Sequence, residues 1–184
     1  VSSERRPAQC HGMQGIIYLD GKTPDIRLPT GKRTSGKRSM SCILRVYGDH
    51  LDPDALIRAG GIEHYSLWRI GERRFPDDEA SRRNASSGVR YRVSDADFSE
   101  LNQQIEDAIR YFRENMPALK RISGFNGVEE AVADFGVDLK PPGLASFCFP
   151  PELLTLAGEA SVHLMISVYP VSDEDDDEQE DDEA

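Results

Sequence analysis

Residues 42–60 constrain the fold more than any other part of the chain, because a strand pattern runs directly into a helix start. Side chains in 42–47 alternate between two faces, which is the period of a strand with one buried side. Asp52 precedes Pro53, a pair typical of a helix N-terminus, where Asp accepts free amide hydrogens and Pro needs no amide partner. Gly60 suits the end of that helix. The pattern therefore predicts a strand followed by a short helix.

Strand patterns return five more times downstream. In one of them Arg90 and Arg92 take the polar face, and in the last His163 does so. The stretch 71–87 is charged and rich in Ser and Asn, so we expect a long mobile loop there. The five predicted strands are 65–70, 88–93, 133–139, 144–149 and 161–168.

The clearest helix lies between the strands at 88–93 and 133–139. Ser94, with Asp97 three residues later, approximates a capping box that would start it. Pro117 is expected either to end this helix or to kink it. A shorter helix is predicted at 150–158. The long helix is indicated by apolar residues spaced three and four apart: Phe98, Leu101, Ile105, Ala108, Ile109, Phe112 and Met116.

The predicted elements follow the order β-α-β-β-α-β-β-α-β. The first six match the split βαβ, or ferredoxin-like, arrangement βαββαβ. Strands with one apolar face favour a mainly antiparallel sheet whose helices cover that face. We therefore predict an α+β fold, with a ferredoxin-like core extended by a βαβ unit.

Charge divides the chain into three parts. Residues 1–39 carry eight Lys or Arg against three Asp or Glu and lack sustained periodicity, so we expect a flexible basic arm. Residues 40–171 have a net charge of −6 and contain the apolar residues of a single α/β domain. Residues 172–184 carry ten acids and no base, which predicts a disordered acidic tail. In an alternative interpretation, Met40 is the natural start and the basic arm is not native.

Composition also bears on the cellular setting. No apolar run approaches the roughly 18 residues of a membrane span, so we expect no membrane association. Cys10, Cys42 and Cys148 are odd in number and far apart, which favours a reduced, cytoplasmic protein. We expect Cys42 and Cys148 to be small buried apolar residues. The four histidines lack metal-ligand spacing, and we expect neither a metal nor a cofactor.

Four short motifs occur in order along residues 41–170. In that order and spacing, with the long helix between them, they resemble the bacterial domain of unknown function 4279 family. The resemblance implies a small cytosolic α/β domain, some of whose members look like immunity proteins that neutralise a neighbouring toxin. It brings no catalytic residues, and the basic arm and acidic tail depart from the usual compact form. The motifs are Tyr47-Gly48-Asp49, Leu51-Asp52-Pro53, Trp68-Arg69-x-Gly71-Glu72 and Phe147-x-Phe149-x-Pro151-Glu152-Leu153-Leu154.

Trp68, Arg69, Glu72 and Asp49 are the candidate partner contacts. Trp and Arg are favoured anchors at protein interfaces. A second interpretation of Trp68 competes, in which it fills the core beneath the long helix. Arg69 and Glu72 are then the better contact candidates, because they lie on the opposite face or in the following loop.

Three acids, Asp49, Asp52 and Asp54, cluster beside His50. Neighbouring carboxylates can act as acid and base or bind a hard cation, so a small hydrolase-like enzyme with a cleft near Asp49 and His50 is an alternative. A structural explanation competes, because Asp52 suits a helix cap and Asp54 lies where the helix dipole favours an acid. We expect the structural role and assign no catalytic residue.

The leading functional hypothesis is a non-catalytic protein-binding module of immunity-protein type, which covers a partner surface. Its acidic charge would speed encounter with a basic partner such as a toxin. A homodimer is the other partner hypothesis. Nucleic-acid binding through the basic arm is a further alternative, but the acidic body and tail would repel nucleic acid. The basic residues that would contact phosphates are Arg5, Arg6, Lys32, Arg33, Lys37 and Arg38.

Overall fold

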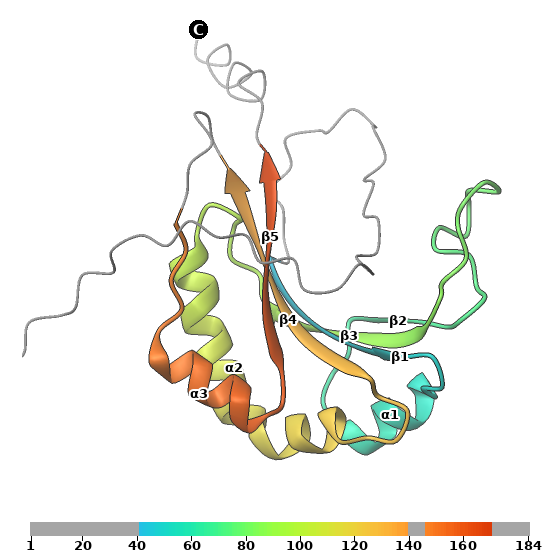
Figure 1. Cartoon of the computed structure of the whole chain (residues 1–184), viewed down its shortest axis with the longest axis horizontal. Coiled ribbons are helices and arrows are strands. Elements are labelled where there is room, and N and C mark those ends of the chain that lie inside the picture. The colour runs from blue at the N-terminus through green and yellow to red at the C-terminus, as the bar shows by residue number, and fades with distance from the viewer. Residues whose placement is uncertain (1–40, 140–145, 171–184) are drawn as a thin grey trace, which may run out of the picture. The chain divides into compact units, whose positions relative to one another are not determined.

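The computed structural model describes residues 41–139 and 146–170 (Figure 1). The predicted basic arm and acidic tail lie outside these residues. Within the described ranges the elements follow the chain in this order: β1 (Cys42–Gly48), α1 (Pro53–Gly60), β2 (Ser66–Trp68), β3 (Ser87–Ser94), α2 (Leu101–Ser123), β4 (Glu130–Leu139), α3 (Pro151–Glu159) and β5 (His163–Pro170).

One sheet contains all five of these strands, in the order β2-β3-β1-β4-β5. The pairs β2–β3, β3–β1 and β1–β4 are antiparallel, whereas β4 and β5 are parallel. The first four strands have the order of a ferredoxin-like core, and α3 provides the crossover that a parallel fifth strand requires. The predicted α+β class with a mainly antiparallel sheet is confirmed.

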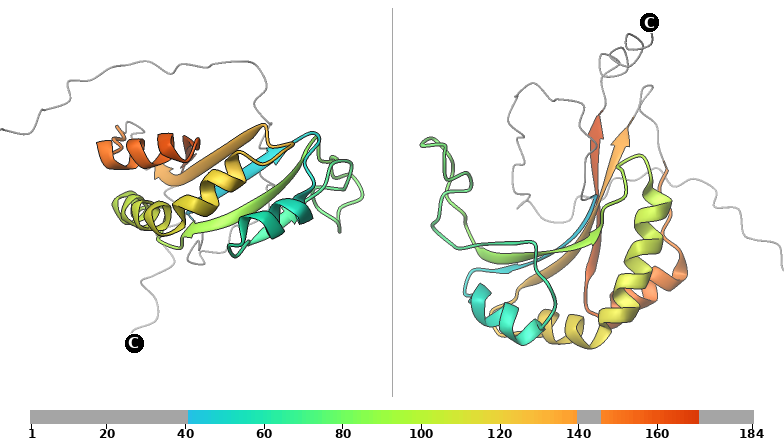
Figure 2. Two further views of the ribbon diagram at one scale, coloured as in Figure 1. Left: turned by 90° about the horizontal axis from the view of Figure 1, so that it is seen from below. Right: turned by 180° about the vertical axis from the view of Figure 1, so that it is seen from behind.

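The three helices pack on one face of this sheet (Figure 2). Because side chains alternate along a strand, the intervening residues lie on the opposite face, which no described helix covers. We call this second surface the open face. Its residues on the central strands are Ile43, Arg45, Tyr47, Gly88, Arg90, Arg92, Val132 and Asp134. The opposite, helix-covered face is made by Leu44, Val46, Val89, Tyr91, Ala133 and Phe135, which bury against Leu56, Phe112, Leu119 and Leu153 of the helices.

Pro117 kinks α2 but does not end it. The helix continues to Ser123, and its axis bends along its length (Figure 2). A proline inside a helix lacks the amide hydrogen that the preceding turn would accept, so helices bend there. The second half of α2 reaches α1, where Arg121 donates hydrogen bonds to the carbonyls of Ala59 and Gly60 at 3.2 and 3.1 Å. These bonds satisfy carbonyls that a helix end leaves without internal partners.

One predicted helix cap and one predicted strand are wrong. Ser94 is the last residue of β3, not the cap of α2, which begins at Leu101. Residues 146–149 are irregular, not the strand predicted at 144–149. Both edges of β4 are already paired, so this segment crosses to α3 instead, and the Phe149 ring packs 5.0 Å from that of Phe135.

The chain between β2 and β3, where a long loop was expected, is hydrogen-bonded to itself. We call it the β2–β3 arm. The Gly71 amide donates to the Asn84 carbonyl at 2.9 Å, and the Asn84 amide donates to the Glu72 carbonyl at 2.8 Å. Farther out, the Arg74 amide donates to the Arg82 carbonyl at 2.9 Å. The arm therefore continues the β2–β3 hairpin away from the sheet, as the green segment in Figure 1 shows.

The two described cysteines differ. Cys42 is fully buried, as predicted. Burial is the main reason that the pKa of its thiol is raised well above the usual value, and the negative charges of Asp134 and Asp107 raise it further. Cys148 is exposed, so the prediction that it is buried is wrong. The reason is local, because residue 148 lies in the irregular segment before α3 and not in a strand with a buried face.

Candidate binding face around Arg90

Two arginines lie directly opposite each other near the centre of the open face. Arg45 on β1 pairs in register with Arg90 on β3. Opposed side chains on antiparallel strands have Cβ atoms about 5 Å apart, and like charges there destabilise a sheet. The guanidinium of Arg45 is compensated by the carboxylate of Asp134 on β4, at 2.9 Å. Arg90 forms no ion pair with any residue that the structure describes.

Arg90 is instead held by neutral groups. Its guanidinium carbon lies 4.5 Å from the centroid of the Trp68 ring, and Nη1 donates to the hydroxyl of Ser66 at 3.3 Å. Burial, followed by the positive charges of Arg45 and Arg74, lowers the pKa of Arg90. No carboxylate of the described residues offsets these effects. Within residues 41–139 and 146–170 the site thus presents a half-buried cation without a counter-charge, an arrangement that a bound anion would stabilise.

Trp68 lies on the open face, so the expectation that it fills the core beneath the long helix is wrong. Consecutive strand residues face opposite sides, and Leu67 takes the side that packs against the core. The Trp68 ring covers Gly88, where an added Cβ would lie 2.2 Å from the ring. Glycine therefore makes room for the stack of Trp68 and Arg90.

A second arginine–aromatic pair extends this face toward the end of β3. The Arg92 guanidinium carbon lies 5.1 Å from the centroid of the Tyr65 ring, and Tyr65 is 46% exposed. Such stacks hold a guanidinium in place and contribute about 0.5–1 kcal/mol at exposed sites. Arg92 also lies 3.4 Å from the carboxylate of Asp95, so this pair is partly compensated. Of the two stacked arginines, Arg90 is the one without an acidic partner among the described residues.

The other half of the open face carries carboxylates that are already hydrogen-bonded. The Tyr47 hydroxyl donates to Glu130, and the Ser167 hydroxyl donates to Asp134 at 2.6 Å. Burial, then the hydrogen bond and charge of Glu130, raise the pKa of Tyr47 to about 12. The open face is thus divided, with unsatisfied positive charge on the β3 side and satisfied negative charge on the β4 side.

The structure brings together two of the predicted contact residues, Arg69 and Glu72, with Asp54 of α1. The Arg69 guanidinium lies 2.7 Å from Asp54 and 3.8 Å from Glu72. The hydrogen bond that Arg69 donates to Asp54, followed by the negative charge of Asp54, raises the pKa of Arg69. Asp49 lies apart from this cluster, in the turn after β1, where its amide donates to the Glu129 carboxylate at 3.2 Å. All of these side chains are exposed, and their role as contacts stays a prediction.

The acids near the first turn have the structural roles that the sequence favours. Asp52 is the N-cap of α1, and its Oδ1 accepts from the amides of Asp54 and Ala55 at 3.0 and 3.1 Å. Asp49 and His50 are both exposed, and neither lines the described pocket. In the described ranges no group of three or more His, Cys, Asp or Glu could hold a metal ion.

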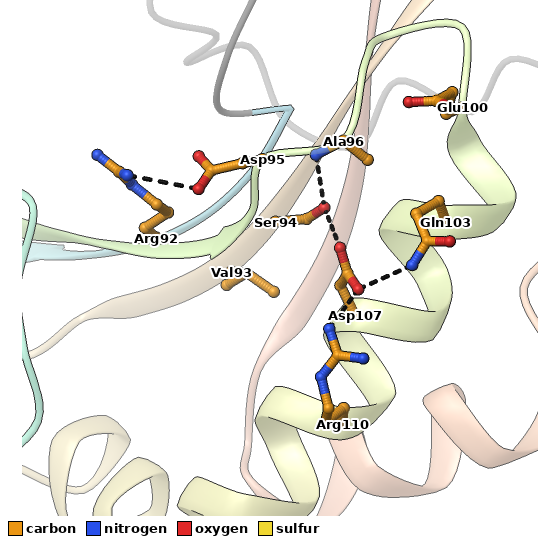
Figure 3. Close-up of a pocket in the computed structure, with 9 residues that line it drawn as sticks. All are labelled: Arg92, Val93, Ser94, Asp95, Ala96, Glu100, Gln103, Asp107 and Arg110. Atoms are coloured by element: carbon orange, nitrogen blue, oxygen red, sulfur yellow. Dashed lines mark hydrogen bonds and ion pairs between the residues drawn. The ribbon is translucent and has the colours of Figure 1, made fainter.

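A shallow pocket of about 350 Å³ lies between the end of β3 and the first turns of α2 (Figure 3). At its centre Asp107 accepts hydrogen bonds from the Ser94 hydroxyl at 2.7 Å, from Gln103 at 3.0 Å and from Arg110. Burial alone would raise the pKa of Asp107, but these three donors outweigh it and lower the pKa. The central carboxylate is already satisfied, so it links β3 to α2 and leaves little charge for a ligand.

Comparisons with known proteins add no identity. No protein-family model, curated protein or solved structure matches the chain. The resemblance to the domain of unknown function 4279 family therefore stays a prediction. No helix in the described ranges is long and apolar enough to cross a membrane.

The sequence did not single out Arg90, although it placed this residue on a polar strand face. The signal that could have found it is the alternation of Arg90 and Arg92 with apolar residues in one strand, since two cations on one face of a strand need counter-charges. The pairing with Arg45 and the stack on Trp68 are not readable from any single segment.

Proposed function

We propose that this protein is a non-catalytic protein-binding module and that the open face around Arg90 and Trp68 is its binding surface. The observation that carries the proposal is the half-buried guanidinium of Arg90, which lies over Trp68 and has no carboxylate partner in the described part of the chain. Arg, Trp and Tyr are the residues most often found as energetic anchors of protein interfaces. Here Trp68 and Arg90 come from adjacent strands of one sheet, and Tyr65 immediately precedes the first of these strands.

The anchors are positioned before binding, which lowers the cost of association. Arg90 is fixed between Trp68 and Ser66, and Arg92 is fixed against Tyr65. Ordering a long side chain at an interface otherwise costs about 0.5–1.5 kcal/mol. A partner that places a carboxylate against Arg90 would gain a charge-assisted hydrogen bond without that cost.

An immunity-type role and a cytoplasmic location are the finer parts of the proposal. They are supported by the resemblance to the domain of unknown function 4279 family and by the net charge of −11, which favours encounter with a basic partner such as a toxin. A basic protein that presents one carboxylate at its contact surface satisfies both the overall charge and the Arg90 site. Arg69 and Glu72, near the base of the β2–β3 arm, are proposed as secondary contacts.

The test is capture of a partner from a lysate of the source organism by the full chain, beside three variants. Trp68→Ala and Arg90→Ala remove the two central anchors. Arg58→Ala removes an exposed arginine of α1 and serves as the matched control. We expect one stoichiometric protein to be retained by the wild type and the control, and lost with either anchor variant. Equal retention by all four chains, or turnover of a small-molecule substrate by the pure protein, would contradict the proposal.

A further inference from the structure

We propose that the chain's own acidic segment, residues 173–183, supplies the carboxylate that Arg90 lacks and so competes with a partner for the open face. The inference concerns regulation of the proposed binding face and, in that respect, rests on the proposed function. Docking of the segment on Arg90 can nonetheless be tested without any partner.

The ligand chemistry follows from how Arg90 is held. The guanidinium carbon lies over the Trp68 ring and Nη1 donates to Ser66, so the other N–H donors of Arg90 have no partner among the described residues. A carboxylate matches the edge of a guanidinium with two parallel hydrogen bonds. The Trp68 ring already contacts Arg90 and lies against Gly88, which reduces the surface on which a nucleic-acid base could stack. The site therefore favours a carboxylate over a nucleobase.

The charge of the whole chain favours a tethered carboxylate over a free one. A net charge of −11 repels acidic molecules in solution, whereas a covalently attached segment cannot diffuse away. Tethering gives an effective concentration in the millimolar range for short flexible connections. Residues 173–183 contain ten Asp or Glu and no Lys or Arg, the densest acidic run in the sequence. This run is thus the best-placed source of the missing counter-charge.

The segment is long enough to reach the site. In the sheet register Arg90 is level with Arg45, Arg45 with Val132, and Val132 with His163 at the start of β5. Seven residues along β5 and three strand spacings therefore separate Pro170 from Arg90, which is about 27 Å at 3.3 Å per residue and 4.8 Å per strand. An extended chain covers this distance with about eight residues, and fourteen follow Pro170.

The experiment uses Trp68, the only tryptophan of the chain, as a reporter in contact with Arg90. The full-length protein is compared with a variant in which all ten acids of 173–183 become their amides. Acrylamide quenching of Trp68 is measured from about 10 mM to about 0.5 M NaCl, a range over which the screening length falls from about 30 Å to a few Å. We expect stronger quenching in the amide variant at low salt and equal quenching at high salt. A synthetic peptide of residues 172–184 should restore protection of the amide variant at low salt.

Arg90→Gln in both tail backgrounds locates the contact. We expect the difference between acidic and amide tails to vanish with Arg90→Gln and to persist with the control Arg58→Gln. Circular dichroism melts verify that each variant is folded. Identical quenching of the acidic and amide tails at low salt, or a difference that survives Arg90→Gln, would overturn the proposal. If quenching behaves as expected and no partner is captured, the docking stands and the proposed function fails. If a partner is captured through Arg90 but the quenching shows no tail effect, the proposed function stands and the docking fails.

Discussion

Arg45 and Arg90 face each other across β1 and β3 on the open face of the sheet, and among the described residues Arg45 has a carboxylate partner whereas Arg90 has none. The sheet accepts this repulsion because each guanidinium is held from its outer side. Asp134 holds Arg45, and Trp68 holds Arg90. Like charges placed opposite each other in a sheet are a cost to stability, and this cost at the centre of the open face is part of the argument for the proposed binding role.

The cost of this pair is measurable by a double-mutant cycle with Arg45→Gln and Arg90→Gln. We expect a repulsive coupling free energy of about 0.2–1 kcal/mol from urea unfolding at low salt, because the two cations are direct cross-strand neighbours. The coupling should shrink as NaCl is added. The cycle of Arg58→Gln with Arg90→Gln should give no coupling beyond about 0.3–0.5 kcal/mol. An attractive or salt-independent coupling for the opposed pair would be inconsistent with the described geometry.

Gly88→Ala tests the position of Trp68. A Cβ at residue 88 would lie 2.2 Å from the Trp68 ring and 2.7 Å from the carbonyl oxygen of Val46, so the ring must move. We expect a loss of about 1–3 kcal/mol in the free energy of unfolding and a red shift of tryptophan emission. Gly158→Ala is the matched control, because nothing lies within 4 Å of its added Cβ and Ala is the better helix former. It should raise stability by up to about 1 kcal/mol without changing the emission.

Two tyrosine-to-phenylalanine changes should have opposite signs. The Tyr91 hydroxyl is buried in the core with no hydrogen-bond partner in the described structure, so Tyr91→Phe should increase the free energy of unfolding by about 1 kcal/mol. Tyr47→Phe removes the hydrogen bond to Glu130 and should decrease it by about 1–2 kcal/mol. The free energy of unfolding of both variants and the wild type is measured by denaturation in guanidinium chloride. A destabilising Tyr91→Phe would mean that its hydroxyl has a partner that the structure does not show.

Asp107 should make stability depend on pH. Its folded pKa lies below the unfolded value near 3.9, so its contribution is fully present above that value and is lost as pH falls through the folded pKa. We expect Asp107→Asn to lower the unfolding free energy by about 1–2 kcal/mol at pH 7, because the charged acceptor is lost. The difference from wild type should diminish below about pH 4. Thermal melts from pH 2 to 8 test this, and a difference constant over that whole range would contradict it.

Much of the fold is predictable because local chemistry decides it. The alternation in 42–47 gives β1, and Asp52 followed by Pro53 gives the capped start of α1. The spacing of apolar residues identifies α2, although not its start at Leu101. These features depend on backbone hydrogen bonds and on neighbours within one or two turns, which a short window of sequence contains.

The failed predictions depend on contacts with distant segments. Residues 146–149 are apolar enough for a strand, but the edges of β4 are occupied by β1 and β5. Ser94 has the chemistry of a helix cap, but the length of β3 makes it the donor to Asp107 instead. In each case local propensity is satisfied in more than one way, and tertiary pairing selects among them.

The sequence by itself determined the α+β class, the apolar side of β1, β3 and β4, and the cap of α1, since periodicity and capping are local properties. It also placed Arg90 on a polar strand face. Only the tertiary structure decided that Arg90 lies opposite Arg45 and stacks on Trp68. The physical reason is strand register, which hydrogen bonding fixes between segments far apart in the chain and which no single segment encodes.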